Sequence, residues 1–181
     1  MNFIGCGYMI KYIDCDGVIL DTETGLFDVY NELKLMNPEL KKKQYLHDLD
    51  WDSWIEQASV LDNAVDLLKF YYCDVVKILT RVHSMNEAIA KINYFRDNGV
   101  KNDIIIVPPG MNKTNIVDAF GNILVEDSNS NLVDWNECHG ISIYYGKGES
   151  NFTSIKSLEE VLDDTKCKKL IKEYKKGSFY G

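Results

Sequence analysis

Short apolar runs alternate with helical patterns along most of the chain. Runs rich in β-branched residues recur at 9–13, 75–79, 104–107, 123–125 and 141–145. Each run is continuous and does not alternate with polar residues, which is typical of strands buried on both faces of a parallel sheet. We therefore predict a parallel sheet built from these five segments.

Helical patterns lie between the runs. Ser84 and Glu87 have the spacing of a capping box, and apolar residues then recur at helical spacing over 85–95. A second helical pattern covers 60–71, and a third begins with Ser157. Strands that alternate with helices in this way predict a three-layer α/β/α sandwich.

One interval breaks the alternation. Residues 21–59 are helical in pattern and charged, with no convincing strand, and the interval includes Trp51 and Trp54. It is too long for a loop inside a compact domain. We therefore predict a small helical cap at 21–59, placed over one end of a core that consists of 1–20 and 60–181.

Length and charge limit the function classes. The chain has 181 residues, 45% of them apolar, which is enough for one domain with a small inserted lid. Its formal net charge of -8 argues against a partner that is a nucleic-acid polymer, because such binders are usually basic. Small anionic substrates stay compatible with this charge, since a metal ion or one lysine can invert the local sign.

Cysteine usage and hydropathy indicate the compartment. Five cysteines are present, an odd number, and no two form a CxxC pair, which argues against disulfides or a zinc site. No apolar run approaches the roughly 18 residues that span a bilayer. The first residues also lack the features of a signal peptide. We expect a cytoplasmic protein without a membrane segment, and we assign no role to residues 1–8.

Polar side chains follow four of the apolar runs. In chain order they are Asp14 and Asp16, then Thr80 with Arg81, then Lys113, and finally Glu126 with Asp127. In open α/β sheets, ligands bind outside the carboxyl ends of the strands, so these side chains should gather at one edge. Carboxylates suit a hard divalent cation, and a hydroxyl and an ammonium suit phosphate oxygens. The pattern therefore indicates a site for a metal and a phosphate.

The order of these residues resembles the haloacid dehalogenase (HAD) superfamily of phosphohydrolases. The four motifs read DCDGV, ILT, NK and VEDS, and together they span residues 14 to 128. The resemblance implies a Rossmann-like core with a cap inserted after the first strand. It also implies a Mg²⁺-dependent phosphomonoester hydrolase that acts on small phosphorylated metabolites.

The resemblance assigns a role to each motif residue. Asp14 would be the nucleophile that forms an aspartyl-phosphate, and Asp16 would be the general acid and base. Thr80 and Lys113 would bind the phosphoryl oxygens. The Asp14 carboxylate, the Asp16 backbone carbonyl and Asp127 would hold magnesium. The carboxylates on this rim would repel each other strongly without a cation, so we expect the metal to be required.

The short cap and the position of Lys113, fourteen residues before Asp127, resemble the 5'(3')-deoxyribonucleotidase branch of the family. One departure concerns the fourth motif, where that branch usually has two aspartates and this chain has Glu126 before Asp127. Glu126 could serve as an acceptor beside the metal or as a direct ligand. The branch implies nucleoside monophosphates as substrates.

Substrate contacts beyond the phosphate are expected from Arg81, Trp51 and Trp54. Aromatic faces can stack on a base, although the sequence slightly favours packing between cap and core for both tryptophans. Three other functions stay open. The chain could bind phosphate or regulate without turnover, it could hydrolyse sugar phosphates or other small metabolite phosphates, or it could be a receiver domain. The long insertion argues against a receiver.

Overall fold

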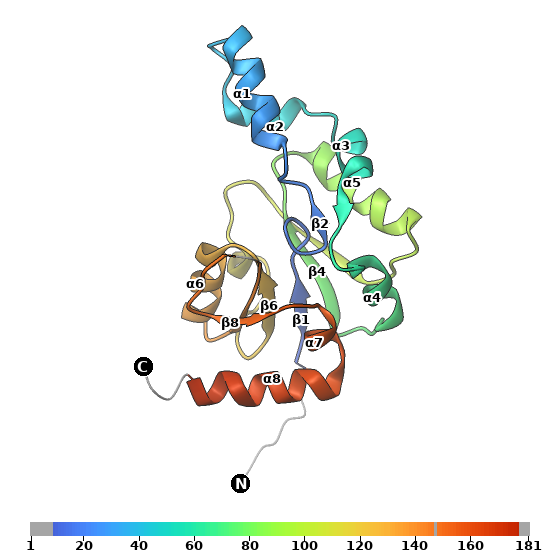
Figure 1. Cartoon of the computed structure of the whole chain (residues 1–181), viewed down its shortest axis with the longest axis vertical. Helices are drawn as coiled ribbons and strands as arrows, with labels where there is room; N and C mark the ends of the chain where they lie inside the picture. Colours follow the sequence, from blue (N-terminus) through green and yellow to red (C-terminus); the bar gives the residue numbers. More distant parts are fainter. Residues whose placement is uncertain (1–8, 147, 178–181) are drawn as a thin grey trace.

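A computed structural model of the protein describes residues 9–146 and 148–177 (Figure 1). The N-terminal extension at residues 1–8, to which the sequence assigns no role, lies outside the described residues. Among the described helices, none combines the length and the apolar character needed to cross a membrane.

Six parallel strands form the central sheet in the order β5-β4-β1-β6-β7-β8. The strands are β1 (Lys11–Ile13), β4 (Val76–Arg81), β5 (Asp103–Val107), β6 (Ile123–Glu126), β7 (Ile141–Tyr145) and β8 (Thr153–Ile155). The first five match the predicted runs, and the predicted α/β fold is confirmed. Strand β8 was not predicted, because three residues with a single buried side chain leave no continuous apolar run.

Helices cover both faces of the sheet (Figure 1). They are α4 (Ala64–Phe70), α5 (Met85–Asp97), α6 (Asn129–Glu137), α7 (Glu159–Leu162) and α8 (Asp164–Gly177), with a short 3₁₀ turn η1 (Lys113–Asn115). The helical pattern predicted at 60–71 begins later than expected, because its first residues form a strand and a turn.

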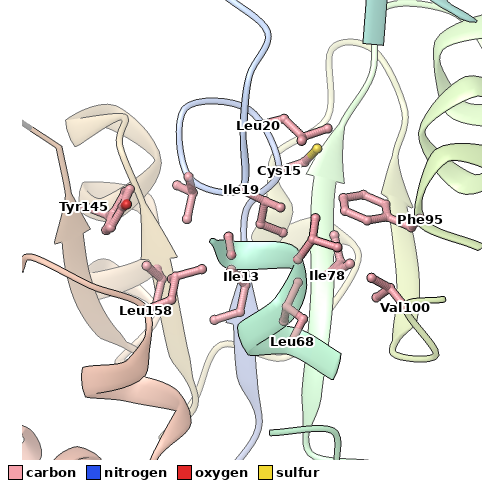
Figure 2. Close-up of a cluster of buried hydrophobic side chains, with 14 of the residues drawn as sticks. Ile13, Cys15, Ile19, Leu20, Leu68, Ile78, Phe95, Val100, Tyr145 and Leu158 are labelled. Carbon is pink, nitrogen blue, oxygen red and sulfur yellow. The ribbon is translucent and has the colours of Figure 1, made fainter. Parts of the chain in front are cut away.

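Adjacent residues of β1 point to opposite faces of the sheet and enter different cores. Ile13 belongs to the larger core, together with Leu68 of α4 and Phe95 of α5 (Figure 2). Tyr12 belongs to the smaller core on the other face, where it meets Trp135 of α6 edge-on. Burial on both faces explains why the strands read as continuous apolar runs.

The interval after β1 contains three helices, α1 (Leu26–Met36), α2 (Lys42–Asp48) and α3 (Trp51–Gln57). Two short antiparallel strands, β2 (Leu20–Asp21) and β3 (Ser59–Val60), join at its base, and they were not predicted. Helices α1 and α2 extend beyond the end of the sheet, whereas α3 packs against α5 (Figure 1). The division into a cap at 21–59 and a core stays a prediction.

Helix α5 buries a different face from the one that its apolar residues suggest. Met85 and Ile89 are exposed, whereas Glu87 and Lys91 are buried. The Ser84 side chain does accept a hydrogen bond from the Glu87 backbone N–H, at 3.1 Å, as a capping box requires. The Glu87 carboxylate does not return to Ser84 and binds elsewhere, and its partners belong to the candidate site.

Candidate active site

Lys113 joins two carboxylates that come from neighbouring strands. Strands β1 and β6 pair in parallel with Ile13 opposite Val125, so the residues that follow, Asp14 and Glu126, lie at the same edge. The Lys113 ammonium is 2.7 Å from Asp14 Oδ1 and 2.6 Å from Glu126 Oε2, and all three side chains are buried. Three residues that are far apart in sequence thus form one charged cluster.

A third carboxylate completes a group that could hold a metal ion. Oxygen atoms of Asp14, Glu126 and Asp127 lie within 4.8 Å of one another. Asp14 Oδ1 is buried and, among the described residues, makes no hydrogen bond of good geometry, although Lys113 lies close to it. A buried acceptor with spare capacity among other carboxylates is a suitable ligand for a hard divalent cation.

The pKa values of these carboxyl groups favour a cation as well. Burial and the neighbouring Glu126 carboxylate raise the pKa of Asp14 well above its usual range. Burial also raises the pKa of Asp127, to about 6. Burial alone would lower the pKa of the Lys113 ammonium, but Asp14 and Glu126 outweigh it and raise that pKa. A divalent cation would restore the ionised form of both aspartates.

This arrangement predicts that Mg²⁺ stabilises the protein more at pH 7.5 than at pH 5. Raised carboxyl pKa values mean that the folded state without metal loses stability as the pH rises through about 6. At 100 times its Kd, Mg²⁺ should add about 2.7 kcal/mol, or roughly 5–10 °C in Tm, at the higher pH. Thermal melts with Mg²⁺ and with EDTA measure this shift. Asp127→Asn should reduce the shift and the exposed Asp103→Asn should not; equal shifts at both pH values would contradict the prediction.

Gly17 makes room for the Asp127 carboxylate. Its φ of +70° lies in the left-handed region, which glycine adopts without strain. A Cβ atom at this position would lie 2.0 Å from Asp127 Oδ2 and 2.6 Å from its Cγ, so no side chain fits. The glycine of the DCDGV motif therefore has two roles: it allows the tight turn after β1, and it leaves space for the Asp127 carboxylate.

We expect Gly17→Ala to displace Asp127 and weaken Mg²⁺ binding by about 10- to 100-fold, the usual effect of disturbing the support of a metal ligand. Gly121→Ala is the matched control. Gly121 has a similar φ of +68°, and a Cβ there meets nothing within 4 Å. Titrating Mg²⁺ by calorimetry on both variants separates backbone strain from loss of the ligand. Equal Mg²⁺ affinities in the two variants would exclude this role of Gly17.

Asp16 is held at both carboxylate oxygens. Thr22 donates to Oδ1 at 2.6 Å, and the Lys91 ammonium lies 2.5 Å from Oδ2. The Thr80 hydroxyl is 3.4 Å from the same Oδ2. Burial alone would raise the pKa of Asp16, but the Lys91 ammonium outweighs it and holds that pKa below its usual value. Asp16 and Thr80, both predicted from the sequence, thus meet in one network.

Lys91 is the site residue that sequence reasoning missed. It lies on α5, four residues after Glu87 and four before Phe95, and all three side chains are buried. This spacing places them on one helical face. The spacing alone did not predict that this face is buried, because the apolar residues Met85 and Ile89 indicated a different face.

Arg81 and His83 lie beside this network. The half-buried Arg81 guanidinium donates to Asn131 Oδ1 at 3.2 Å, and the Asn131 amide donates to Glu126 at 3.0 Å. His83 is exposed, and its ring lies 3.0 Å from Glu87 Oε2. Arg81 is therefore linked to the carboxylate cluster through one side chain. Its predicted contact with substrate stays a prediction.

The two cap tryptophans have different environments. Trp51 is only 3% exposed, and its indole N–H donates to the Leu46 carbonyl at 2.8 Å. This environment favours the packing role that the sequence left open for Trp51, and its contact with a substrate base stays a prediction. Trp54 is half-buried and donates to the Thr22 carbonyl at 2.8 Å. It lines a small cavity of about 210 Å³ with Asp21 and other residues at the base of the cap.

Comparison with known proteins supports the fold. No protein-family model matches the chain, and no curated protein matches it either. Among solved structures, a HAD-superfamily hydrolase of subfamily IA from Geobacter sulfurreducens matches with a TM-score of 0.58 and 10% identity, covering 86% of this chain and 98% of the other. The magnesium-bound HAD hydrolase YfnB from Bacillus subtilis matches with a TM-score of 0.56 and 15% identity, covering 85% and 96%.

A HAD phosphatase from Thermococcus onnurineus matches with a TM-score of 0.53 and 14% identity, covering 84% of this chain and 95% of the other. At these identities the likeness establishes the fold alone. The protein therefore has the Rossmann-like fold that HAD hydrolases share, as the four motifs predict.

Proposed function

We propose that this protein is a Mg²⁺-dependent phosphomonoester hydrolase that acts through an aspartyl-phosphate on Asp14. One observation carries the proposal. The Lys113 ammonium lies 2.7 Å from Asp14 Oδ1, beside a group of three carboxylates at the carboxyl edge of the sheet. Phosphoryl transfer needs a nucleophile, a positively charged side chain that binds the phosphoryl oxygens, and oxygen ligands for a metal ion. Asp14, Lys113 and the carboxylate group match these three requirements. The fold shared with HAD hydrolases supports the same function.

Two half-reactions account for turnover. In the first, a carboxylate oxygen of Asp14 attacks phosphorus and the bond from phosphorus to the leaving oxygen breaks. Asp16, which has to take up a proton before this step because Lys91 favours its ionised form, gives that proton to the leaving oxygen. In the second, Asp16 takes a proton from a water molecule, whose oxygen attacks the same phosphorus. The bond from phosphorus to Asp14 then breaks, which releases inorganic phosphate and restores the carboxylate.

Thr80 and Lys113 would bind the phosphoryl oxygens during both steps. The Thr80 hydroxyl accepts a hydrogen bond from Lys91 at 3.0 Å, and its own hydrogen has two acceptors at long distance, Asp16 Oδ2 and the Arg81 carbonyl, both at 3.4 Å. A phosphoryl oxygen could replace these long contacts as the acceptor. Lys113 is a buried ammonium beside the nucleophile, and its positive charge offsets the charge that gathers there.

The carboxylates of Asp14 and Asp127, with the Asp16 backbone carbonyl, would hold magnesium. Glu126 belongs to the same group but is engaged by Lys113 at 2.6 Å and by Asn131 at 3.0 Å. These contacts fit a role in which Glu126 accepts hydrogen bonds and orients Lys113. They fit a role as a direct metal ligand less well. When bound, Mg²⁺ would neutralise charge on the transferring phosphoryl group.

Activity with a simple substrate tests the proposal. The purified protein should hydrolyse p-nitrophenyl phosphate in the presence of Mg²⁺, EDTA should stop the reaction, and added Mg²⁺ should restore it. A folded protein that releases no phosphate from any member of a panel of phosphorylated metabolites would favour the non-catalytic phosphate-binding function.

For the substrate we propose nucleoside monophosphates, as the resemblance to the 5'(3')-deoxyribonucleotidase branch implies. A cavity of about 550 Å³ is lined by Asp127 of the carboxylate group, by Gly17 beside it, and by Tyr144 and Tyr145. Its volume lies in the range of small-molecule sites, and aromatic side chains suit a base. Of the two cap tryptophans, Trp54 is the one that keeps partial exposure, and it lines the neighbouring cavity of about 210 Å³, which shares Asp21 with this one.

The comparison to make is kcat/KM for nucleoside monophosphates against glycerol and sugar phosphates. Stacking on one aromatic ring is worth about 1–3 kcal/mol, a preference of roughly five- to 150-fold. Trp54→Ala should reduce the preference without a matching loss on p-nitrophenyl phosphate. Sugar phosphates as the better substrates would contradict the nucleotide proposal and leave the phosphatase proposal standing.

A further inference from the structure

Lys91 is a fully buried ammonium behind the predicted general acid. It lies 2.5 Å from Asp16 Oδ2 and 2.7 Å from Glu87 Oε1. It also donates to the Thr80 hydroxyl at 3.0 Å and to the Arg81 backbone carbonyl at 3.3 Å. Its contacts therefore reach the loop after β1, the end of β4 and its own helix α5.

Stability of α5 alone does not explain this arrangement. A buried ammonium needs a counter-charge, and Glu87, one turn earlier on the same helix, supplies it. Lys91 nevertheless also contacts Asp16, which lies 75 residues away in the sequence. Burying further charges is costly unless the geometry and the hydrogen bonds are good. The contact with Asp16 therefore indicates that Lys91 has a role at the candidate active site.

Glu87 fixes the ammonium in place. Its Oε2 accepts the His83 backbone N–H at 2.6 Å and lies 3.0 Å from the His83 ring, while its Oε1 faces Lys91. The His83 ring in turn lies parallel to the ring of the buried Trp51 of α3, with centroids 6.1 Å apart. Glu87 thus fixes the position of the Lys91 ammonium, and His83 in turn fixes the Glu87 carboxylate.

Asp16 is restrained from two directions as a result. Lys91 holds Oδ2 from the α5 side, and Thr22 holds Oδ1 from the side of the cap base. The Thr22 carbonyl is itself bound by the indole N–H of Trp54. Two fixed partners on the two oxygens define both the position and the plane of the carboxyl group.

We propose that Lys91 is a positioning residue for Asp16, the carboxyl group that would exchange protons with the leaving oxygen and the attacking water. The inference rests on the proposed phosphohydrolase function. Lys91 acts through Asp16 and Thr80 and does not touch the substrate. By occupying the Thr80 oxygen as a donor, it also directs the hydroxyl hydrogen away from itself and toward an acceptor.

The test compares two leaving groups in single-turnover measurements of phosphoryl transfer. Lys91→Met should slow transfer from an alkyl phosphate such as glycerol phosphate by about 100-fold, the cost of misplacing a catalytic group by about 1 Å. Transfer from p-nitrophenyl phosphate, which needs little protonation, should slow much less. The double variant Lys91→Met with Asp16→Asn should be no slower on the alkyl substrate than Asp16→Asn alone, because the two changes remove the same function, proton transfer by Asp16.

Lys11→Met is the matched control, because Lys11 is also a buried lysine paired with a carboxylate, Asp164, but lies at the opposite end of β1. It should leave the ratio of the two rates unchanged. Equal losses on both leaving groups in Lys91→Met, or losses that multiply in the double variant, would overturn the inference.

Removing the Lys91 charge could unfold the protein, since the buried Glu87 and the half-buried Asp16 would both lose their counter-ion. The variant Lys91→Met with Glu87→Gln removes the uncompensated charge of the more deeply buried carboxylate, and its crystal structure gives a readout that needs no activity. The inference expects the Asp16 carboxyl to turn away from Thr80, and an unmoved carboxyl overturns it. A wild-type protein without phosphatase activity would overturn the proposed function, while this structural readout would still decide the position of Asp16.

Discussion

Asp14→Asn should abolish phosphomonoester hydrolysis, with kcat lower by about 10⁴-fold or more, while the fold stays intact. An amide cannot attack phosphorus at a useful rate, and losing a member of a group that acts as a unit costs several orders of magnitude. The substitution keeps the shape of a buried side chain beside Lys113. Phosphate release measured with p-nitrophenyl phosphate and Mg²⁺ gives the rate, and circular dichroism checks the fold.

Asp103→Asn is a suitable control, because Asp103 is exposed and pairs with Lys77 at the start of β5, far from the carboxyl edge. It should keep the wild-type rate. If a well-folded and uncontaminated Asp14→Asn protein retained more than a few per cent of the wild-type activity, the nucleophile would have to be another residue.

The sheet and most of the motif residues could be predicted because both follow from short local patterns. Each strand of the core is buried on two faces, so each appears as an apolar run, and the chemistry follows the run at its carboxyl end. Asp14 with Lys113 and Asp16 with Thr80 do lie together. The chain order was sufficient to expect these residues at one edge of the sheet, and the resemblance to the HAD superfamily assigned them to one site.

Lys91 and Glu87 could not be predicted in the same way, because their burial depends on a contact between distant parts of the chain. An amphipathic pattern normally places lysine and glutamate in solvent and methionine or isoleucine in the core. In α5, Met85 and Ile89 are exposed while Glu87 and Lys91 are buried. The ion pairs that Lys91 forms with Asp16 and with Glu87 make burial of these charged residues tolerable. No local pattern contains Asp16 and Lys91 together.

The cap illustrates a second limit. Its helical character was evident from the sequence, but a tryptophan in an amphipathic helix can face either a ligand or the core. Trp51 faces the core and packs over His83, whereas Trp54 binds the backbone of Thr22. The two short strands at the base of the cap are two residues each, which is too short to give any periodicity.

Lys113→Met should reduce both catalysis and stability, and it is the second large effect that we expect. Methionine has a similar length but no charge, so Asp14 and Glu126 would lose the ammonium that lies 2.7 and 2.6 Å from them. Losing one stabilising donor for a developing negative charge costs about 10²–10³-fold in kcat. Breaking a buried ion pair on one side costs about 3–5 kcal/mol, because a charge stays buried without compensation.

Two further variants separate the catalytic loss from the loss of stability. Glu126→Gln combined with Lys113→Met removes one uncompensated charge, so it should recover part of the free energy of unfolding without recovering kcat. Lys11→Met breaks a different ion pair of a buried lysine, with Asp164, and should lower stability but keep kcat at saturating substrate. Urea unfolding and steady-state kinetics on all three variants measure the two effects independently. If the double variant regained wild-type turnover along with its stability, Lys113 would be a structural counter-ion of Glu126 and not a ligand of the phosphoryl group.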